Sequence, residues 1–512
     1  MNNKSFSFLR GFLFPVHWHE MKSFLPMALM MLFILCNYTI LRNLKDTLVV
    51  NADGSGAEVI SFLKLWGTMP SAIIFMIIYS KLANLFSREK IFYVCLIPFM
   101  IFFAAFAYVI YPNTAFLHPN PATVASLQEN FPNFKWFLAI WGNWSYALFY
   151  ILAELWGSVM LSLLFWQFAN DIVKKEQTKR FYPLFGMIAN VGLICAGLLA
   201  KYFAASGDWQ NTLHSLVGIV LVGGTVVGAL FYYINRNLDK EALVLAAPIE
   251  KKKAKLSITE SLRYLATSPH LLCIALIVLG YGISINYVDV IWKGQAKELF
   301  AGSKAAYSDY MGNFSITTGL IAIPIMLVAG NLLRKISWKK AALITPIILL
   351  STGFGFFSLI LLGQSFGNPN APIFEIGSFS VTFLWLGVQF GLLQNALTKA
   401  TKYSLFDSTK EMAYIPLDKE LKTKGKAAVD VVASRLGKSG GALTFFIIQS
   451  ILPNVTLVSQ IPFLAIATLL ILGVWFFAVG KLDKSIKELN GEAEKSSREP
   501  VAGILAAEPS RA

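Results

Sequence analysis

The chain has 512 residues, of which 56% are hydrophobic and only 14% are charged, and its mean hydropathy is +0.59. Too few polar side chains remain to coat several soluble domains, so most of the surface must face lipid. The four cysteines lie far apart in apolar runs, which argues against a disulfide framework or a zinc cluster. The net charge of +15 would suit nucleic acid, but the basic residues gather in alternate loops and act as topology signals, so no nucleic-acid partner is expected.

Apolar runs of about 20 residues, the length that crosses a bilayer, recur along the whole chain. In the first half they lie near residues 24–43, 60–83, 91–111, 143–168, 183–203 and 214–235. In the second half they lie near 271–293, 307–332, 339–363, 375–398, 427–452 and 457–480. A polar stretch that contains the basic run KKKAK separates the two sets. The chain is therefore predicted to be an all-α polytopic membrane protein with about twelve transmembrane helices.

Lysine and arginine are distributed unevenly between the loops. If both ends, residues 236–270 and every second loop are placed on one side, that side carries 33 Lys and Arg residues and the other carries 4. Basic loops stay in the cytoplasm, so both termini are predicted to be cytoplasmic. No cleavable signal peptide is evident at the N-terminus.

Six plus six spans favour a major-facilitator-like arrangement of two bundles, residues 1–235 and 271–481. A basic cytoplasmic linker at 236–270 would join the bundles. A polar tail at 482–512 would form a short helix followed by disorder. The two long loops near 112–142 and 399–426 have room for short interfacial helices.

Ionisable side chains interrupt several of the apolar runs, where an unpaired charge is costly. In the first span Tyr38, Arg42 and Lys45 recur at helical spacing and share one face. Lys64 lies one turn into the second span, where it would either extend to the interface or join Lys45 in making a central cavity positive. Glu154 lies deep in the fourth span, either as a gating carboxylate or as one partner of a structural salt bridge.

The second half carries charges of both signs as well. In the seventh span Asp289 and Lys293 stand four residues apart and can form an ion pair. The eleventh span contains the sequence ASRLGKSGG, whose glycines would allow close helix approach. Its GKSG is not a nucleotide-hydrolase phosphate loop, because Val432 stands where that motif requires glycine. Cations exceed isolated carboxylates, which predicts a multiply charged anionic substrate, and the cations predicted to bind it are Arg42, Lys45, Lys64, Arg435 and Lys438.

A second group of side chains could recognise a flat polar ring. The fifth span begins RFYPLFGMIANVG, which places Gly186 and Asn190 on one face with Phe185 alongside. An aromatic ring would stack on a base and an asparagine would bond to a base edge, although generic aromatic packing is the alternative. The residues predicted to hold a nucleoside are Tyr146, Tyr150, Phe185, Gly186, Asn190 and Asn286.

These segments resemble a known family. LRNLKDTLVVNADGSGAEVISFLKLWG, AELWGSVMLSLLFWQFAN, RFYPLFGMIANVG, YGISINYVDVIWKGQAKELF, MGNFSITTG and ASRLGKSGGAL are similar to the nucleotide transporters of plastids and intracellular bacteria, the ATP/ADP translocases of Chlamydia- and Rickettsia-like organisms. The resemblance implies exchange of host ATP for bacterial ADP and phosphate across a bacterial inner membrane, without hydrolysis. It also implies a functional role for Lys45, Glu154, Asp289 and Lys438. Plant plastid members carry glutamate where this chain has Asp289.

The sequence therefore predicts a nucleotide antiporter that works by alternating access. Its predicted partners are ATP, ADP, the lipid bilayer and, as a further candidate, inorganic phosphate, and the working unit is predicted to be a monomer. In the empty carrier Glu154 and Asp289 are predicted to pair with cations. Two rivals remain, namely a proton-coupled net importer of nucleotides and a membrane-embedded enzyme. No cofactor, metal site or catalytic residue is predicted, because the five histidines lie at span ends or in loops.

Overall fold

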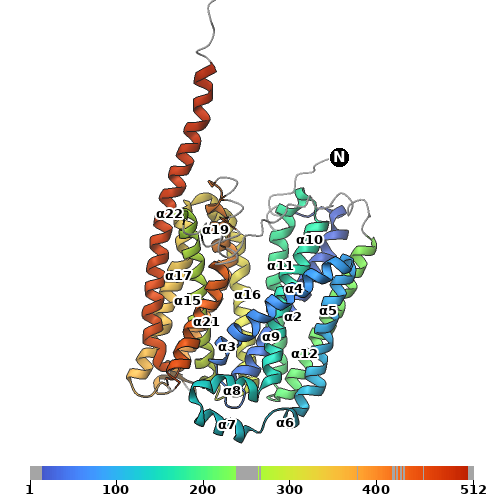
Figure 1. The fold of residues 1–512 in the computed structure, drawn as a ribbon, viewed down its shortest axis with the longest axis vertical. Helices are drawn as coiled ribbons and strands as arrows, with labels where there is room; N and C mark the ends of the chain where they lie inside the picture. Colours follow the sequence, from blue (N-terminus) through green and yellow to red (C-terminus); the bar gives the residue numbers. More distant parts are fainter. Residues whose placement is uncertain are drawn as a thin grey trace, which may run out of the picture.

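The computed structural model describes residues 14–237, 267–376, 379–417, 433–453 and 455–504, together with residues 263, 421, 425, 426 and 429. We call residues 14–237 the N-terminal half and residues 267–504 the C-terminal half. Their helices form two groups that stand side by side (Figure 1). We call the end of the bundle at which both chain termini emerge the termini end, and the end that carries α6–α8 the far end.

The N-terminal half consists of helices with short connections. Its elements are η1 (Trp18–Glu20), α2 (Met21–Val50), α3 (Val59–Phe62), η2 (Leu63–Thr68), α4 (Met69–Leu85), α5 (Arg88–Ala105), η3 (Phe106–Ile110), η4 (Tyr111–Asn113), α6 (Thr114–Leu117), α7 (Pro121–Asn130), η5 (Pro132–Phe134), α8 (Lys135–Gly142), α9 (Trp144–Trp156), η6 (Gly157–Phe165), α10 (Trp166–Ile172), α11 (Lys175–Ala204) and α12 (Trp209–Asn237). The short helices that the loop near 112–142 has room for are present as α6, α7 and α8.

The C-terminal half repeats this pattern of long helices. Its elements are α15 (Pro269–Leu299), α16 (Lys304–Lys335), α17 (Trp338–Ser365), β1 (Pro372–Ile376), β2 (Phe379–Thr382), α18 (Phe383–Thr401), η7 (Lys402–Phe406), α19 (Asp407–Ala413), α21 (Ser434–Ile451), η10 (Val458–Gln460) and α22 (Ile461–Ile504). Side-chain caps fix three helix starts, because Ser268, Ser303 and Thr382 each accept a hydrogen bond from a backbone amide in the first turn. Helix α22 continues to Ile504, beyond the short helix expected for the tail.

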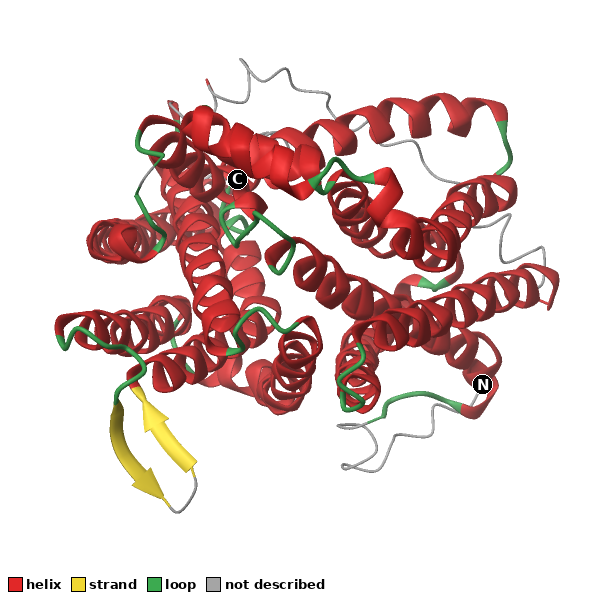
Figure 2. Ribbon diagram, turned by 90° about the horizontal axis from the view of Figure 1, so that it is seen from below, coloured by secondary structure: helices red, strands yellow, loops and turns green. Residues whose placement is uncertain are grey.

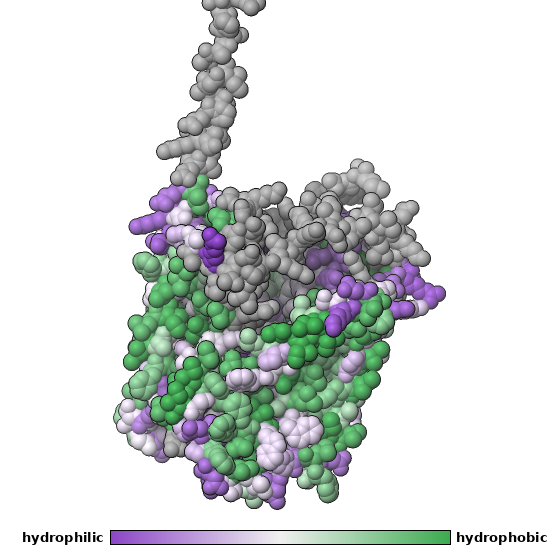
Figure 3. All heavy atoms as spheres, viewed as in Figure 1, coloured by the Kyte–Doolittle hydropathy of each residue, from purple (hydrophilic) through white to green (hydrophobic). Residues whose placement is uncertain are grey.

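Ten helices of the described chain are long and apolar enough to cross a membrane. They coincide with ten of the twelve predicted segments, and their side chains form an apolar belt between polar ends (Figure 3). The other two predicted segments correspond to α18 and α21. The segment expected at 375–398 begins as a β-hairpin, in which Glu375 pairs with Ser380, and becomes helical only at Phe383 (Figure 2). Alternating aromatic and β-branched residues favour strands there, and Thr382 caps the helix that follows.

Glycines bring the two halves together along α11 and α16. A Cβ atom added at Gly197 would lie 2.5 Å from the backbone oxygen of Gly312, and one added at Gly319 would lie 2.9 Å from the backbone oxygen of Asn190. Small residues let helix backbones approach this closely in membranes, where van der Waals packing rather than the hydrophobic effect holds helices together.

The substitution Gly197→Ala is expected to separate α11 from α16 and to destabilise the detergent-purified protein by about 1–3 kcal/mol. The measurement is the thermal unfolding midpoint. Gly473→Ala in α22 is the matched control, because a Cβ atom there would meet nothing within 4 Å. Equal midpoints for the two variants would contradict a tight contact between α11 and α16.

Candidate functional site

A chain of alternating charges connects the two halves inside the bundle. Lys45 Nζ lies 3.0 Å from Glu154 Oε1 and 2.6 Å from Asp46 Oδ1. The other oxygen of Asp46 lies 3.0 Å from Lys293 Nζ, which also lies 2.8 Å from Asp289 Oδ2. We call these five residues and Lys64, whose ammonium lies 3.9 Å from Asp289 Oδ2, the ion network.

Four helical segments supply the ion network. Helix α2 provides Lys45 and Asp46, η2 provides Lys64, and α9 provides Glu154, all from the N-terminal half. Helix α15 of the C-terminal half provides Asp289 and Lys293 one turn apart. The bond between Asp46 and Lys293 therefore joins α2 to α15 directly. Lys45 and Asp46 have side chains at most 5% exposed, so these charges are sheltered from solvent and their attraction is strong.

Three lysines and three carboxylates make the ion network electrically balanced. In this conformation Lys45 and Lys64 each have a carboxylate partner, and their predicted contribution to a positive central cavity stays a prediction. Lys64 also donates a hydrogen bond to Asn286 Oδ1 at 2.8 Å, so it does not extend away to the interface. The prediction that Glu154 and Asp289 pair with cations agrees with this geometry, as does the expected ion pair between Asp289 and Lys293.

Two predicted nucleoside residues lie at the ion network. The Lys45 ammonium sits 3.8 Å from the centre of the Tyr150 ring, which places a cation on an aromatic face. The Tyr150 hydroxyl is buried and has no hydrogen-bond partner within the described ranges. Asn286 accepts from Lys64 and donates to the backbone oxygen of Gly282 at 3.0 Å. In this state both side chains support the ion network.

The other predicted nucleoside residues lie elsewhere. Tyr146 packs against Tyr111 and His118 near the start of α9. Phe185 is fully buried and stacks on Phe24, with ring centres 5.5 Å apart, so the structure favours the packing alternative for its ring. Gly186 and Asn190 face Met326 of α16 across the boundary between the halves.

The side chains of Arg435 and Lys438 lie outside the described part of the structure, so their predicted role in phosphate binding stays a prediction. Their helix, α21, packs closely on α15. A Cβ atom added at Gly282 would lie 2.6 Å from the backbone of Gly437, which confirms that α21 glycines permit close helix approach.

At the far end of the bundle the two halves are in contact. Lys297 Nζ donates to the backbone oxygen of Ser55 at 2.6 Å, which attaches α15 to the loop after α2. Trp136 donates to Gln449 at 3.1 Å. The ring centres of Phe62 and Phe446 lie 5.1 Å apart. The structure is therefore closed at the far end.

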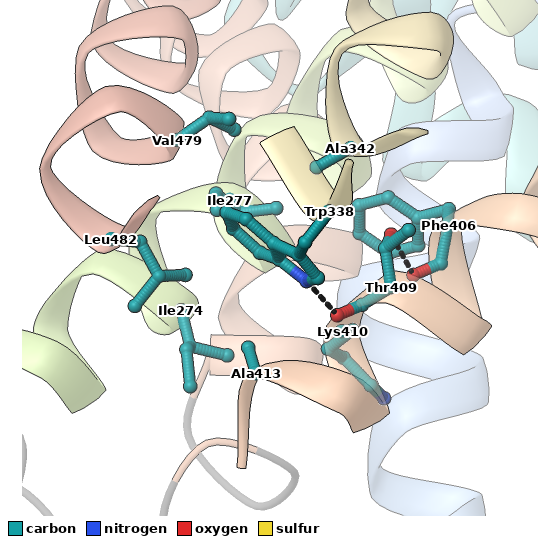
Figure 4. Close-up of a pocket in the computed structure, with 10 residues that line it drawn as sticks. All are labelled: Ile274, Ile277, Trp338, Ala342, Phe406, Thr409, Lys410, Ala413, Val479 and Leu482. Atoms are coloured by element: carbon teal, nitrogen blue, oxygen red, sulfur yellow. Dashed lines mark hydrogen bonds between the residues drawn. The ribbon is translucent and has the colours of Figure 1, made fainter. Parts of the chain in front are cut away.

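A separate cavity lies within the C-terminal half between α15, α17, α19 and α22 (Figure 4). Its walls are mainly apolar, and its polar contacts are internal, since Trp338 donates to the backbone oxygen of Thr409 at 2.9 Å. Its one charged lining residue, Lys410, lies 3.6 Å from Glu411. This chemistry does not suit a multiply charged anion.

Two members of the ion network were not assigned roles from the sequence. The only hint in the sequence was that Asp46 directly follows Lys45. That position does not show that the second carboxylate oxygen of Asp46 contacts Lys293 in the other half. Lys293 was predicted only as the partner of Asp289. A further cation, Lys399, was assigned to a loop after residue 398, whereas it lies inside α18.

Comparison with solved structures identifies proteins with a similar fold. It resembles the D-xylose-proton symporter, with a TM-score of 0.53 and 15% sequence identity over 90% of this chain and 96% of that one. It also resembles a bacterial homologue of the iron transporter ferroportin in the inward-facing state, with a TM-score of 0.56 and 14% identity over 91% of this chain and 100% of that one. The protein is thus an all-α polytopic membrane protein with a transporter fold.

Sequence comparison narrows this class to one family. The profile of the TLC ATP/ADP transporter family matches residues 1–486. "ADP,ATP carrier protein 1" of Chlamydia pneumoniae is 46% identical over 496 residues, which cover 94% of each chain. "ADP,ATP carrier protein 1" of Rickettsia bellii (strain RML369-C) is 44% identical over 497 residues, which cover 95% of this chain and 98% of the relative. The chain belongs to the TLC ATP/ADP transporter family.

Proposed function

We propose that this protein exchanges external ATP for internal ADP by alternating access, without hydrolysing ATP. The observation that carries the proposal is the ion network, a charge-balanced set of buried and partly buried ion pairs that joins the two halves of a transporter fold. The names of the relatives supply the substrate pair. Inorganic phosphate is a further candidate cargo alongside ADP.

The ion network suggests how substrate and conformation are coupled. Phosphate oxygens compete with Glu154 for Lys45 and with Asp289 for Lys64, because both acceptors are anionic and bond to the same ammonium groups. A nucleotide that displaces these carboxylates weakens the bond between α2 and α9 and the bond between η2 and α15, of which the second joins the two halves. The halves can then separate at the far end and close at the termini end, which moves the site across the membrane.

Obligatory exchange has a physical reason in the same groups. To open the far end the two ion pairs that cross between the halves, Asp46 with Lys293 and Lys64 with Asp289, must separate. Lys64 then has no carboxylate partner within the ion network, and an uncompensated charge inside the membrane costs several kcal/mol. A bound nucleotide compensates the lysines during the transition. The empty carrier has no such compensation, so movement without cargo is slow.

In this proposal the termini end faces the cytoplasm of a bacterial cell, and the protein lies in the inner membrane. Residues 1–235 and 271–481 act as two bundles joined by the linker at 236–270, with the tail at 482–512 on the same side. The protein works as a monomer and as a carrier rather than an enzyme. Arg435 and Lys438 complete the cation set at the phosphates.

The test is uptake of labelled ATP into proteoliposomes loaded with ADP, with a panel of unlabelled nucleotides as competitors. We expect uptake to require internal ADP and to be inhibited by ADP and ATP more strongly than by other nucleotides. Intact ATP should be recovered inside the vesicles. Equal uptake into empty vesicles would contradict the exchange mechanism.

The carboxylates Asp46, which is buried, and Glu154 and Asp289, which are partly buried, also keep the proton-coupled importer as a second candidate. A carboxylate that loses its lysine in a low-dielectric site is a natural proton acceptor. The same vesicles distinguish the two mechanisms. A pH gradient, acidic outside, drives ATP into empty vesicles if transport is proton-coupled and has no such effect on an exchanger.

A further inference from the structure

Two cations beside the ion network have no carboxylate partner in the described part of the chain. They are Arg42 of α2 and Lys399 of α18. The Nη2 atom of Arg42 is buried without a hydrogen-bond partner from the described residues. Both side chains are only partly exposed, so their charges are costly to leave uncompensated.

The two cations meet at one aromatic ring. Lys399 Nζ lies 4.3 Å from the centre of the Phe314 ring, and Arg42 Cζ lies 5.8 Å from the same centre. Their charged groups are therefore no more than about 10 Å apart. The ring face offsets part of the repulsion between them, but an aromatic ring does not replace a full negative charge. The pair presents two positive charges next to an ion network whose own charges cancel.

Arg42 also has a defined position relative to the closed far end. It precedes Lys45 by one turn of α2, which runs from the termini end toward the far end (Figure 1). Arg42 thus lies nearer the termini end than Lys45 does. Arg42 belongs to the N-terminal half and Lys399 to the C-terminal half, so an anion that bonds to both would connect the halves.

We propose that Arg42 and Lys399 form the binding site for the phosphoryl groups of a nucleotide that enters from the termini end. This inference rests on the proposed function and adds Lys399 to the substrate-binding residues. A guanidinium bonds to two phosphate oxygens at once, and an ammonium acts as a compact second charge. A chain of two or three phosphoryl groups is long enough to bond to both cations at any separation up to this limit of about 10 Å. Two cations match the several negative charges of two or three phosphoryl groups better than those of one, so the site favours nucleoside diphosphates and triphosphates over monophosphates. It holds ADP before the ion network opens.

The test is equilibrium binding of labelled ADP to the detergent-purified full-length protein. Lys399→Gln and Arg42→Gln are each expected to weaken ADP binding roughly ten- to hundredfold, the effect of losing one charge-assisted bond, with AMP binding affected much less. Lys399→Arg should retain most of the affinity. The control is Lys487→Gln in α22, which removes an exposed lysine whose partner is Asp483 on the same helix, at 2.8 Å.

Every result of this binding experiment either supports the proposed phosphate site or contradicts it. Wild-type ADP affinity in Lys399→Gln, with an unchanged unfolding midpoint, would overturn the inference. If the variant unfolds, the ADP affinity of Lys399→Arg decides instead, and a loss as large as that expected for glutamine would assign Lys399 a structural role and overturn it. If the wild-type protein binds pyrophosphate but not ADP, the proposed function fails. A loss of pyrophosphate binding in Lys399→Gln would then still support the anion site.

Discussion

Replacing Lys45 with glutamine is expected to lower ATP/ADP exchange by roughly a hundredfold or more. Lys45 bonds to Glu154 at 3.0 Å and to Asp46 at 2.6 Å, so its loss leaves two carboxylates facing each other inside the bundle with one cation fewer. Its loss also removes a positive charge that the proposal assigns to the phosphates. The measurement is the initial rate of labelled ATP uptake into ADP-loaded vesicles.

A double variant separates the structural part of this effect from the functional part. Lys45→Gln combined with Glu154→Gln removes one cation and one anion together, and Asp46 keeps its bond to Lys293 at 3.0 Å. We expect the double variant to recover most of the thermal stability lost in the single variant but none of the exchange. Exchange near the wild-type rate in the double variant would show that neither group acts on substrate or on the gate.

The sequence predicted most of the helices, because a spanning helix requires a long apolar run and this requirement is local. The prediction of helices was less accurate where polar and β-forming residues interrupt an apolar run. The segment expected at 375–398 overlaps the end of β1 and all of β2, so α18 begins only at Phe383 and extends to Thr401. The helix also extends beyond the predicted boundary at residue 398, which moves Lys399 from a predicted loop into the last turn of α18. One displaced boundary was enough to hide a candidate binding residue.

Pairings across the two halves could not be predicted from helical periodicity. Spacing within one helix correctly predicted that Asp289 and Lys293 form a pair at i, i+4. It could not show that Lys293 reaches Asp46 or that Lys64 reaches Asn286, since those contacts depend on how α15 packs against α2 and η2. Aromatic residues were ambiguous for a related reason. Phe185 and Tyr150 both occur at helical spacing, but one ring is buried among phenylalanines and the other lies under Lys45.

Cross-linking the two halves at the far end is expected to stop exchange almost completely. The loop after α2 touches α15 there, through the hydrogen bond from Lys297 to the backbone of Ser55. In a variant whose four native cysteines are replaced by alanine, Ser55→Cys with Lys297→Cys can be joined by a short reducible thiol cross-linker. If the far end must open in each cycle, the cross-link blocks uptake and its reduction restores uptake.

The matched control places the cross-link within one half. Gln128 of α7 bonds to the backbone oxygen of Gly54 at 3.0 Å, so Ser55→Cys with Gln128→Cys ties together two parts of the N-terminal half. Rigid halves that rock against each other tolerate this second cross-link, and exchange should continue. ADP binding from the termini end should survive both cross-links, because they join residues at the far end and involve neither Arg42 nor Lys399. Undiminished exchange with the cross-link between Ser55→Cys and Lys297→Cys in place would mean that the far end is not a gate, and that the ion network holds the halves together without controlling access.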